Sequence, residues 1–90
     1  MFSQTTTRIW GTKNAWSLAP QSESDGPGQE CEVELELQGN EKEGFHLVMS
    51  PSGFFTADHW HETKREALNS AKELFGTEDS DWSKTRGAAR

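Results

Sequence analysis

The clearest pattern in the chain is a strict alternation of polar and apolar residues over residues 30–37, which read E-C-E-V-E-L-E-L. Successive side chains of a β-strand point to opposite faces, so the stretch predicts a strand over about residues 30–38. The outer face of this strand would carry four glutamates, Glu30, Glu32, Glu34 and Glu36. The face toward a core would carry Cys31, Val33, Leu35 and Leu37.

Two further strands follow a polar turn at residues 39–43. Apolar residues alternate over residues 45–50, and residues 54–61 form the third predicted strand. Residues 51–53 (Pro-Ser-Gly) suit a three-residue hairpin loop, because proline favours the second position of a type I turn and glycine the left-handed residue that closes it. Such a loop predicts the cross-strand pairs Ser50 with Phe54, Met49 with Phe55, Leu47 with Ala57, and Phe45 with His59.

This register assigns the side chains of the sheet to two faces, and a slip of one residue would exchange them. The predicted core face adds to the first strand's apolar residues Phe45, Leu47, Met49, Phe55 and Ala57. The predicted outer face carries His46, Val48, Phe54, Thr56, Asp58 and Trp60.

Residues 63–76 predict a helix with both ends marked. Thr63 and Glu66 match a capping box, in which the threonine hydroxyl accepts from the Glu66 amide and the Glu66 carboxylate accepts from the Thr63 amide. Gly76 stands where a left-handed residue ends a helix, and Trp82 is expected to fold back onto the helix end or the sheet. One apolar stripe at helical spacing follows the cap: Ala67, Leu68, Ala71, Leu74 and Phe75.

The two ends of the chain give weaker patterns. Residues 1–29 are predicted as a poorly defined segment, with apolar clusters around Trp10 and Trp16 that could add a strand or hairpin, followed by a flexible Gly/Ser/Pro-rich linker. Residues 83–90 are predicted as a disordered tail. The expected fold is a single α+β domain over residues 30–82: an antiparallel meander of three strands, or four with the N-terminal segment, packed against one C-terminal helix (β-β-β-α).

Composition and charge narrow the classes of function. The 90 residues carry a net charge of −6, and eight acids against one base place −7 of it within residues 23–43. Such a field repels nucleic acid and favours a basic partner, although charge on a strand is also a common guard against edge pairing. One cysteine excludes an intrachain disulfide and suits a reducing compartment. With no apolar run of signal-peptide or membrane-spanning character, the sequence predicts a cytoplasmic protein.

The C-terminal half resembles a recurring pattern in small bacterial proteins of unknown function. In that pattern a strand ending in Asp-x-Trp-His-x-Thr, here residues 58–63, runs into a helix of Glu-Ala-x-x-x-Ala-x-x-x-Phe-Gly type, here residues 66–76. The resemblance covers about residues 44–82 and implies no established activity.

The order of three strands and a helix, with Thr-x-x-Glu-Ala at the helix start, is more distantly similar to HicB-type antitoxin domains and other double-stranded-RNA-binding-like folds. The chain departs from the antitoxin pattern because it has no appended DNA-binding helices and its first strand is acidic. That similarity implies an antitoxin-like or RNA-binding role only by analogy of fold.

Two groups of side chains are candidates for catalysis or metal binding. His46 opposite Asp58 resembles an acid–base dyad, but no nucleophile motif accompanies it, so an enzyme is not expected. His59 and His61 share one strand face at a spacing that suits metal ligands. Structural zinc takes four ligands, so no metal or other cofactor is expected, and His61 is predicted to hydrogen-bond near the helix start.

The predicted partner-binding residues lie on the acidic strand and the outer sheet face: Glu32, Glu34, Glu36, Trp60, Phe54, His46 and Asp58. An aromatic patch around Trp60 would be exposed unless the N-terminal segment, with Trp10 and Trp16, packs there as a lid. The sequence therefore favours an interaction module for another protein, which could be basic, with weak homodimerisation as a further option and no membrane partner. The alternative is an antitoxin-like or RNA-binding domain, and a small enzyme is the least favoured interpretation.

Overall fold

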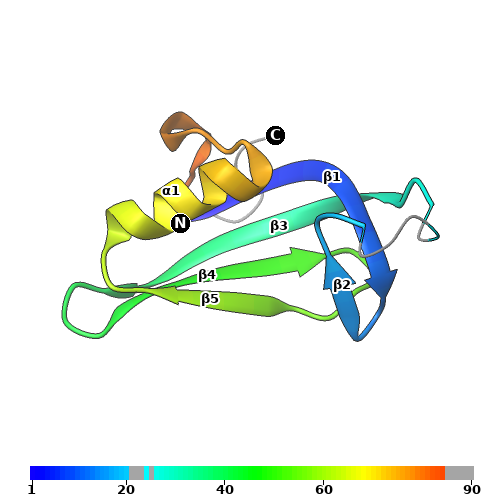
Figure 1. Cartoon of the computed structure of the whole chain (residues 1–90). Coiled ribbons are helices and arrows are strands. Elements are labelled where there is room, and N and C mark those ends of the chain that lie inside the picture. The colour runs from blue at the N-terminus through cyan, green and yellow to red at the C-terminus, as the bar shows by residue number, and fades with distance from the viewer. Residues whose placement is uncertain (21–23, 25, 85–90) are drawn as a thin grey trace.

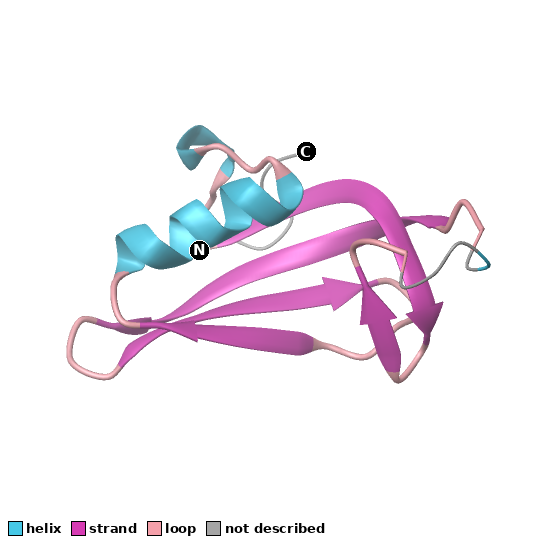
Figure 2. Ribbon diagram, viewed as in Figure 1, coloured by secondary structure: helices cyan, strands magenta, loops and turns pink. Residues whose placement is uncertain are grey.

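The computed structural model describes residues 1–20, 24 and 26–84, which form one curled antiparallel sheet with a helix on one face (Figures 1 and 2). In the described residues the strands are β1 Phe2–Thr12, β2 Ala15–Ser17, β3 Gln29–Asn40, β4 Gly44–Pro51 and β5 Ala57–His61. They lie side by side in the order β2-β1-β3-β4-β5. The helix α1 spans Lys64–Phe75, and a short 3-10 helix, η2, spans Asp79–Asp81.

The α+β class with one C-terminal α-helix is confirmed, but the sheet has five strands, more than the three or four that the sequence predicted. The additional strands come from residues 2–17. β1 pairs antiparallel with β3, from Phe2 opposite Glu36 to Ile9 opposite Gln29. The period-2 signal of β1 is weak because the residues that it turns toward the core are mostly hydroxylic (Ser3, Thr5 and Thr7).

The core lies between the inner face of the sheet and α1. Its sheet side is the predicted alternating set on β3 and β4, all of it buried: Cys31, Val33, Leu35, Leu37, Phe45, Leu47 and Met49. The helix adds Ala67, Leu68 and Ala71. Ile9 of β1 is also part of the core, at 1% exposure, and the sequence patterns did not predict it.

The predicted register between β4 and β5 is wrong by two residues. Leu47 lies opposite His59 rather than Ala57, and Phe45 lies opposite His61 rather than His59. The Pro51 turn does form, with the Phe54 amide donating to the Pro51 carbonyl at 3.1 Å and Gly53 at φ 87°. The chain does not enter β5 directly, however, and a longer connection up to Thr56 precedes the strand.

The two phenylalanines of this connection depart from their predicted faces. Phe54 packs against the apolar cluster rather than on the outer face, and Phe55 is 45% exposed rather than in the core. Phe55 is tied instead to the β1–β2 turn, since its amide donates to the Lys13 carbonyl at 2.9 Å. A shift of two residues keeps the remaining side chains of β5 on their predicted faces, since the side-chain period of a strand is two.

The helix ends follow the sequence signals closely. The Thr63 hydroxyl accepts from the Glu66 amide at 3.1 Å, although the Glu66 carboxylate contacts the Thr63 hydroxyl rather than returning to its amide. Gly76 ends the helix at φ 72° and donates to the Lys72 carbonyl at 2.9 Å. None of the helices in the described residues is both long and apolar enough to cross a membrane.

The C-terminal segment returns to the start of the chain. Trp82 packs against the core, as predicted. Phe2 and Ser83 exchange backbone hydrogen bonds of 2.7 and 2.8 Å, and the Ser3 hydroxyl donates to the Asp81 carbonyl at 3.1 Å. The remainder of the predicted tail, from residue 85, and residues 21–23 and 25 of the predicted linker lie outside the described residues.

Two neighbouring residues of β4 provide a test of the assigned faces. We expect Leu47→Ala to lower the free energy of unfolding by about 2–5 kcal/mol, because it leaves a cavity under α1. Val48→Ala, on the outer face, should lower it by about 1 kcal/mol or less. Urea denaturation measures both values, and equal losses would contradict the assignment of faces.

The Arg65–Asp79 pair, which joins the start of α1 to η2, provides a second test. Its bonds are 3.2 and 3.0 Å, and the hydrogen bond from Arg65 lowers the pKa of Asp79. A lowered folded pKa means that the pair stabilises the fold above the unfolded pKa and that this stabilisation is lost as the pH falls through the folded one. Arg65→Gln should return the Asp79 pKa toward its ordinary value in an NMR titration. Lys64→Gln, with the same charge change, should leave the lowered pKa in place.

Candidate functional site

The outer face of the sheet is strongly acidic. The acidic row consists of Glu30, Glu32, Glu34 and Glu36 on β3. Residues directly opposite one another in antiparallel strands share a face, so the row lies between Gln4, Thr6 and Arg8 of β1 and Val48 and Ser50 of β4. The helix, Trp16 of β2 and Trp82 all contact the apolar cluster, so they pack on the other face of the sheet.

The charges of the acidic row repel one another. Side chains two residues apart on a strand are about 7 Å apart, which corresponds to roughly 0.6 kcal/mol of repulsion per neighbouring pair in water. Arg8 lies opposite Glu30, but its guanidinium also donates to the Pro27 carbonyl at 3.2 Å. A cationic group that approached this face from outside would relieve the repulsion, so the row can attract basic ligands.

His46 and Asp58 form the predicted pair in a different geometry. His46 Nδ1 and Asp58 Oδ2 are 2.7 Å apart, yet the two residues are diagonal neighbours, because His46 lies opposite Trp60 and Asp58 opposite Val48. Both side chains are roughly half exposed on the outer face. The contact extends the polar surface from the acidic row toward β5.

Trp60 lies on the outer face, as the sequence predicted, and its side chain is 55% exposed. Its indole covers Gly44, where any side chain would collide with the ring, and its N–H donates to the Glu43 carbonyl at 3.1 Å. An aromatic ring that shields a strand glycine in this way stabilises a sheet edge. The predicted aromatic patch is therefore reduced to Trp60 and Val48, because Phe54 packs on the core side.

The predicted N-terminal lid over the outer face is wrong. β1 extends the sheet beside β3, and the hairpin then turns β2 onto the inner face, where Trp16 packs against the core. Trp10 covers Gly28 and donates to the Gly26 carbonyl at 2.9 Å. The two tryptophans thus lie on opposite faces of the N-terminal hairpin and do not cover the outer face of the sheet together.

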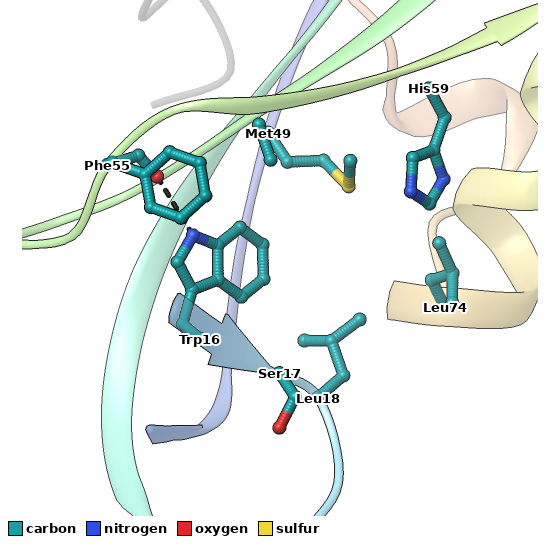
Figure 3. Close-up of a pocket in the computed structure, with 8 residues that line it drawn as sticks. Trp16, Ser17, Leu18, Met49, Phe55, His59 and Leu74 are labelled. Atoms are coloured by element: carbon teal, nitrogen blue, oxygen red, sulfur yellow. Dashed lines mark hydrogen bonds between the residues drawn. The ribbon is translucent and has the colours of Figure 1, made fainter. Parts of the chain in front are cut away.

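An apolar cavity of about 270 Å³ lies on the inner face, between β2, β5 and the C-terminal end of α1 (Figure 3). Trp16 holds one wall, because its N–H donates to the Phe55 carbonyl at 2.9 Å. Two of the large exposed apolar side chains border the cavity, Phe55 at 45% and Leu74 at 38% exposure. The full lining is Trp16, Ser17, Leu18, Met49, Phe55, Ala57, His59 and Leu74.

Sequence reasoning missed this cavity because its walls come from four separate parts of the chain. The apolar cluster at Trp16 and Leu18 was the available signal, but nothing in the local pattern indicated what that cluster faces. Its position depends on the bond between the Phe55 amide and the Lys13 carbonyl.

The two histidines of β5 lie in different surroundings. His59 is exposed at the cavity, whereas His61 is half-buried and its Nε2 has no hydrogen-bond partner in the described part of the chain. The predicted hydrogen bond of His61 near the helix start is thus not seen at this atom. Across the described ranges, no three His, Cys, Asp or Glu side chains gather as metal ligands. Cys31 is a buried free thiol.

The chain was compared with protein-family models, with curated proteins and with solved structures, and none of the three comparisons finds a match. The resemblance to small bacterial proteins and to antitoxin-like folds therefore stays a prediction from the sequence. Two surfaces of the described residues bear on function, the acidic outer face and the apolar cavity.

The indole of Trp60 provides a test of its structural role. We expect Trp60→Ala to lower the free energy of unfolding by on the order of 1 kcal/mol, because it uncovers Gly44 and removes the bond to Glu43. Trp60→Phe keeps a ring over Gly44 and should recover part of the loss. Denaturation curves compare the two variants, and an alanine variant as stable as the wild type would show that the ring has no structural role.

Proposed function

We propose that the chain is an interaction module that binds a basic surface of another protein through the outer face of its sheet. The observation that carries the proposal is the acidic row, which points away from a sheet whose inner face is occupied by the core. Glu32, Glu34 and Glu36 would supply most of the attraction. His46 and Asp58 would extend the polar contact to β5, and Trp60 would offer a ring face to a lysine or arginine.

The spacing of the acidic row suits a partner whose basic side chains repeat at a regular distance. Side chains on one strand face repeat about every 7 Å, and basic residues at i and i+4 of a helix repeat about every 6 Å. A basic helix or a strand with alternating lysines could therefore meet several glutamates at once. A partner of this kind would also remove the repulsion within the row, which a neutral surface would not do.

The alternative roles lack comparable support. An RNA or DNA backbone would be repelled by a face that carries four carboxylates, so an antitoxin-like or RNA-binding role does not suit this surface. His46 and Asp58 do not line the apolar cavity, so this pair gives no reason to expect catalysis there.

The test uses three immobilised proteins and host lysate at low salt, with and without nuclease. One is the wild type, and one carries Glu32→Gln, Glu34→Gln and Glu36→Gln. The third is a control with Glu41→Gln, Glu62→Gln and Glu73→Gln, which makes the same change in net charge at exposed positions outside the row. Thermal unfolding should first show that all three proteins are folded.

We expect a basic protein to be retained by the wild type and the control and lost by the row variant, whether or not nuclease is present. Its affinity should fall on the order of tenfold between low and physiological salt, because exposed charges are screened within about 8–10 Å. Equal retention by all three proteins would overturn the proposal. Retention that disappears with nuclease would favour the nucleic-acid alternative.

A further inference from the structure

We infer that β5 accepts an extended segment of a partner protein as an additional strand, and that the apolar side chains of this segment enter the cavity beside Leu74. β5 lies at the edge of the sheet, beyond β4, whereas the acidic row lies on β3. The two surfaces share Asp58 and Trp60, but the acidic row belongs only to the first and the cavity only to the second, so variants of the row and of the cavity test them separately.

The backbone of β5 presents hydrogen-bonding groups at this edge. On β3, the Leu37 amide points toward β1, because it donates to the Met1 carbonyl. The Glu32 carbonyl points toward β4, because it accepts from the Ser52 amide. The bonding direction alternates along a strand, and the registers from β3 to β5 run without interruption. The N–H and C=O groups of Asp58 and Trp60 consequently point away from β4, toward the edge of the sheet, where no strand of the described residues pairs with β5.

The cavity adjoins this edge. Ala57 and His59, on the inner face of β5, are part of its lining. Leu18 and Leu74 lie across the cavity from His59 (Figure 3). A strand added to β5 would lie about 4.8 Å away and would direct alternate side chains toward the same inner side. A cavity of about 150 Å³ holds a benzene molecule, so the 270 Å³ available here has room for a large apolar side chain.

The outer side of the edge selects a different kind of side chain. Residues of an added antiparallel strand that lie opposite Asp58 and Trp60 would share the outer face with them. A lysine or arginine there would meet the Asp58 carboxylate and the exposed face of the Trp60 indole. The segment that fits best therefore alternates apolar residues on the inner side with basic residues on the outer side.

A second copy of the chain fits this edge less well than such a segment. β5 reads A-D-H-W-H, so a partner β5 would offer alanine and two histidines to the apolar cavity. It would also bring together two chains that each carry a charge of −6. Strand addition of this kind takes its affinity from backbone hydrogen bonds and its specificity from alternate side chains. The side-chain surfaces at β5 select a peptide in which basic and apolar residues alternate.

The probe is a fluorescein-labelled peptide of sequence Lys-Leu-Lys-Val-Lys-Leu-Lys, with binding followed by fluorescence anisotropy at fixed salt. Two derivatives carry backbone N-methyl groups, one on the lysine amides and the other on the leucine and valine amides. In antiparallel addition the lysine amides point toward β5 and donate to it, so methylating them should weaken binding at least tenfold. Methylating the leucine and valine amides, which point away from β5, should leave the affinity unchanged. Parallel addition would reverse the two results. Equal affinity of the two methylated peptides would overturn the inference.

Variants of the protein locate the peptide. Leu74→Glu should weaken binding at least tenfold, although it adds a negative charge that would attract lysine. Asn69→Glu, at another exposed position of α1, is the matched control and should bind as the wild type does. Full binding by the Leu74 variant would overturn the inference.

The row variant with Glu32→Gln, Glu34→Gln and Glu36→Gln separates this site from the acidic row. It should retain the peptide within a few-fold. Loss in the row variant together with full binding by Leu74→Glu would place the peptide on the acidic row, which would support the proposed function and overturn strand addition at β5. Light scattering tests whether a second copy of the chain occupies the β5 edge. A wild-type dimer that Leu74→Glu converts to a monomer would identify the second copy as the occupant and overturn the inference.

Discussion

The alternation along β3 is the constraint on which the rest of the molecule depends. One face of this central strand is fully apolar and the other carries four carboxylates, and β1 and β4 pair with it on its two sides. Burying an ionised carboxylate without a partner is far more costly than leaving it in water. The helix and β2 therefore both pack on the apolar side of the sheet. The core, the apolar cavity and the acidic outer face all follow from this single strand.

The elements that the sequence predicted well are those that local residues determine. β3 and β4 have a clean period of two, and α1 has Thr63 and Gly76 at its ends. The N-terminal segment was predicted only as an optional fourth strand or hairpin, because Thr5 and Thr7 occupy the inward positions of β1 and give no apolar alternation. The register of β5 could not be predicted either, because a longer connection follows the Pro51 turn and its Phe55 amide bonds to Lys13, which is far away in sequence.

The candidate surfaces divide in the same way. The acidic row could be predicted because it lies on one strand, and the contact of His46 with Asp58 forms although the register is shifted, since a shift of two residues preserves the face. Phe54 was placed on the wrong face because it lies in a connection before β5 rather than in the strand itself. The apolar cavity was not predicted, because residues from β2, β4, β5 and α1 meet there only after the sheet has curled.

The pairing of Phe2 with Ser83 has a consequence for biosynthesis. Ser3 and Asp81, which are also bonded, are 78 residues apart, so one end of β1 is secured by residues that leave the ribosome long after it. Contacts between distant parts of a chain form slowly, because the intervening loop must first be closed. The N-terminal end of β1 can pair with β3 earlier, but its bonds to Asp81 and Ser83 have to wait for nearly all of the described residues. Chaperones that hold nascent chains would meet this protein with its first strand still incompletely secured.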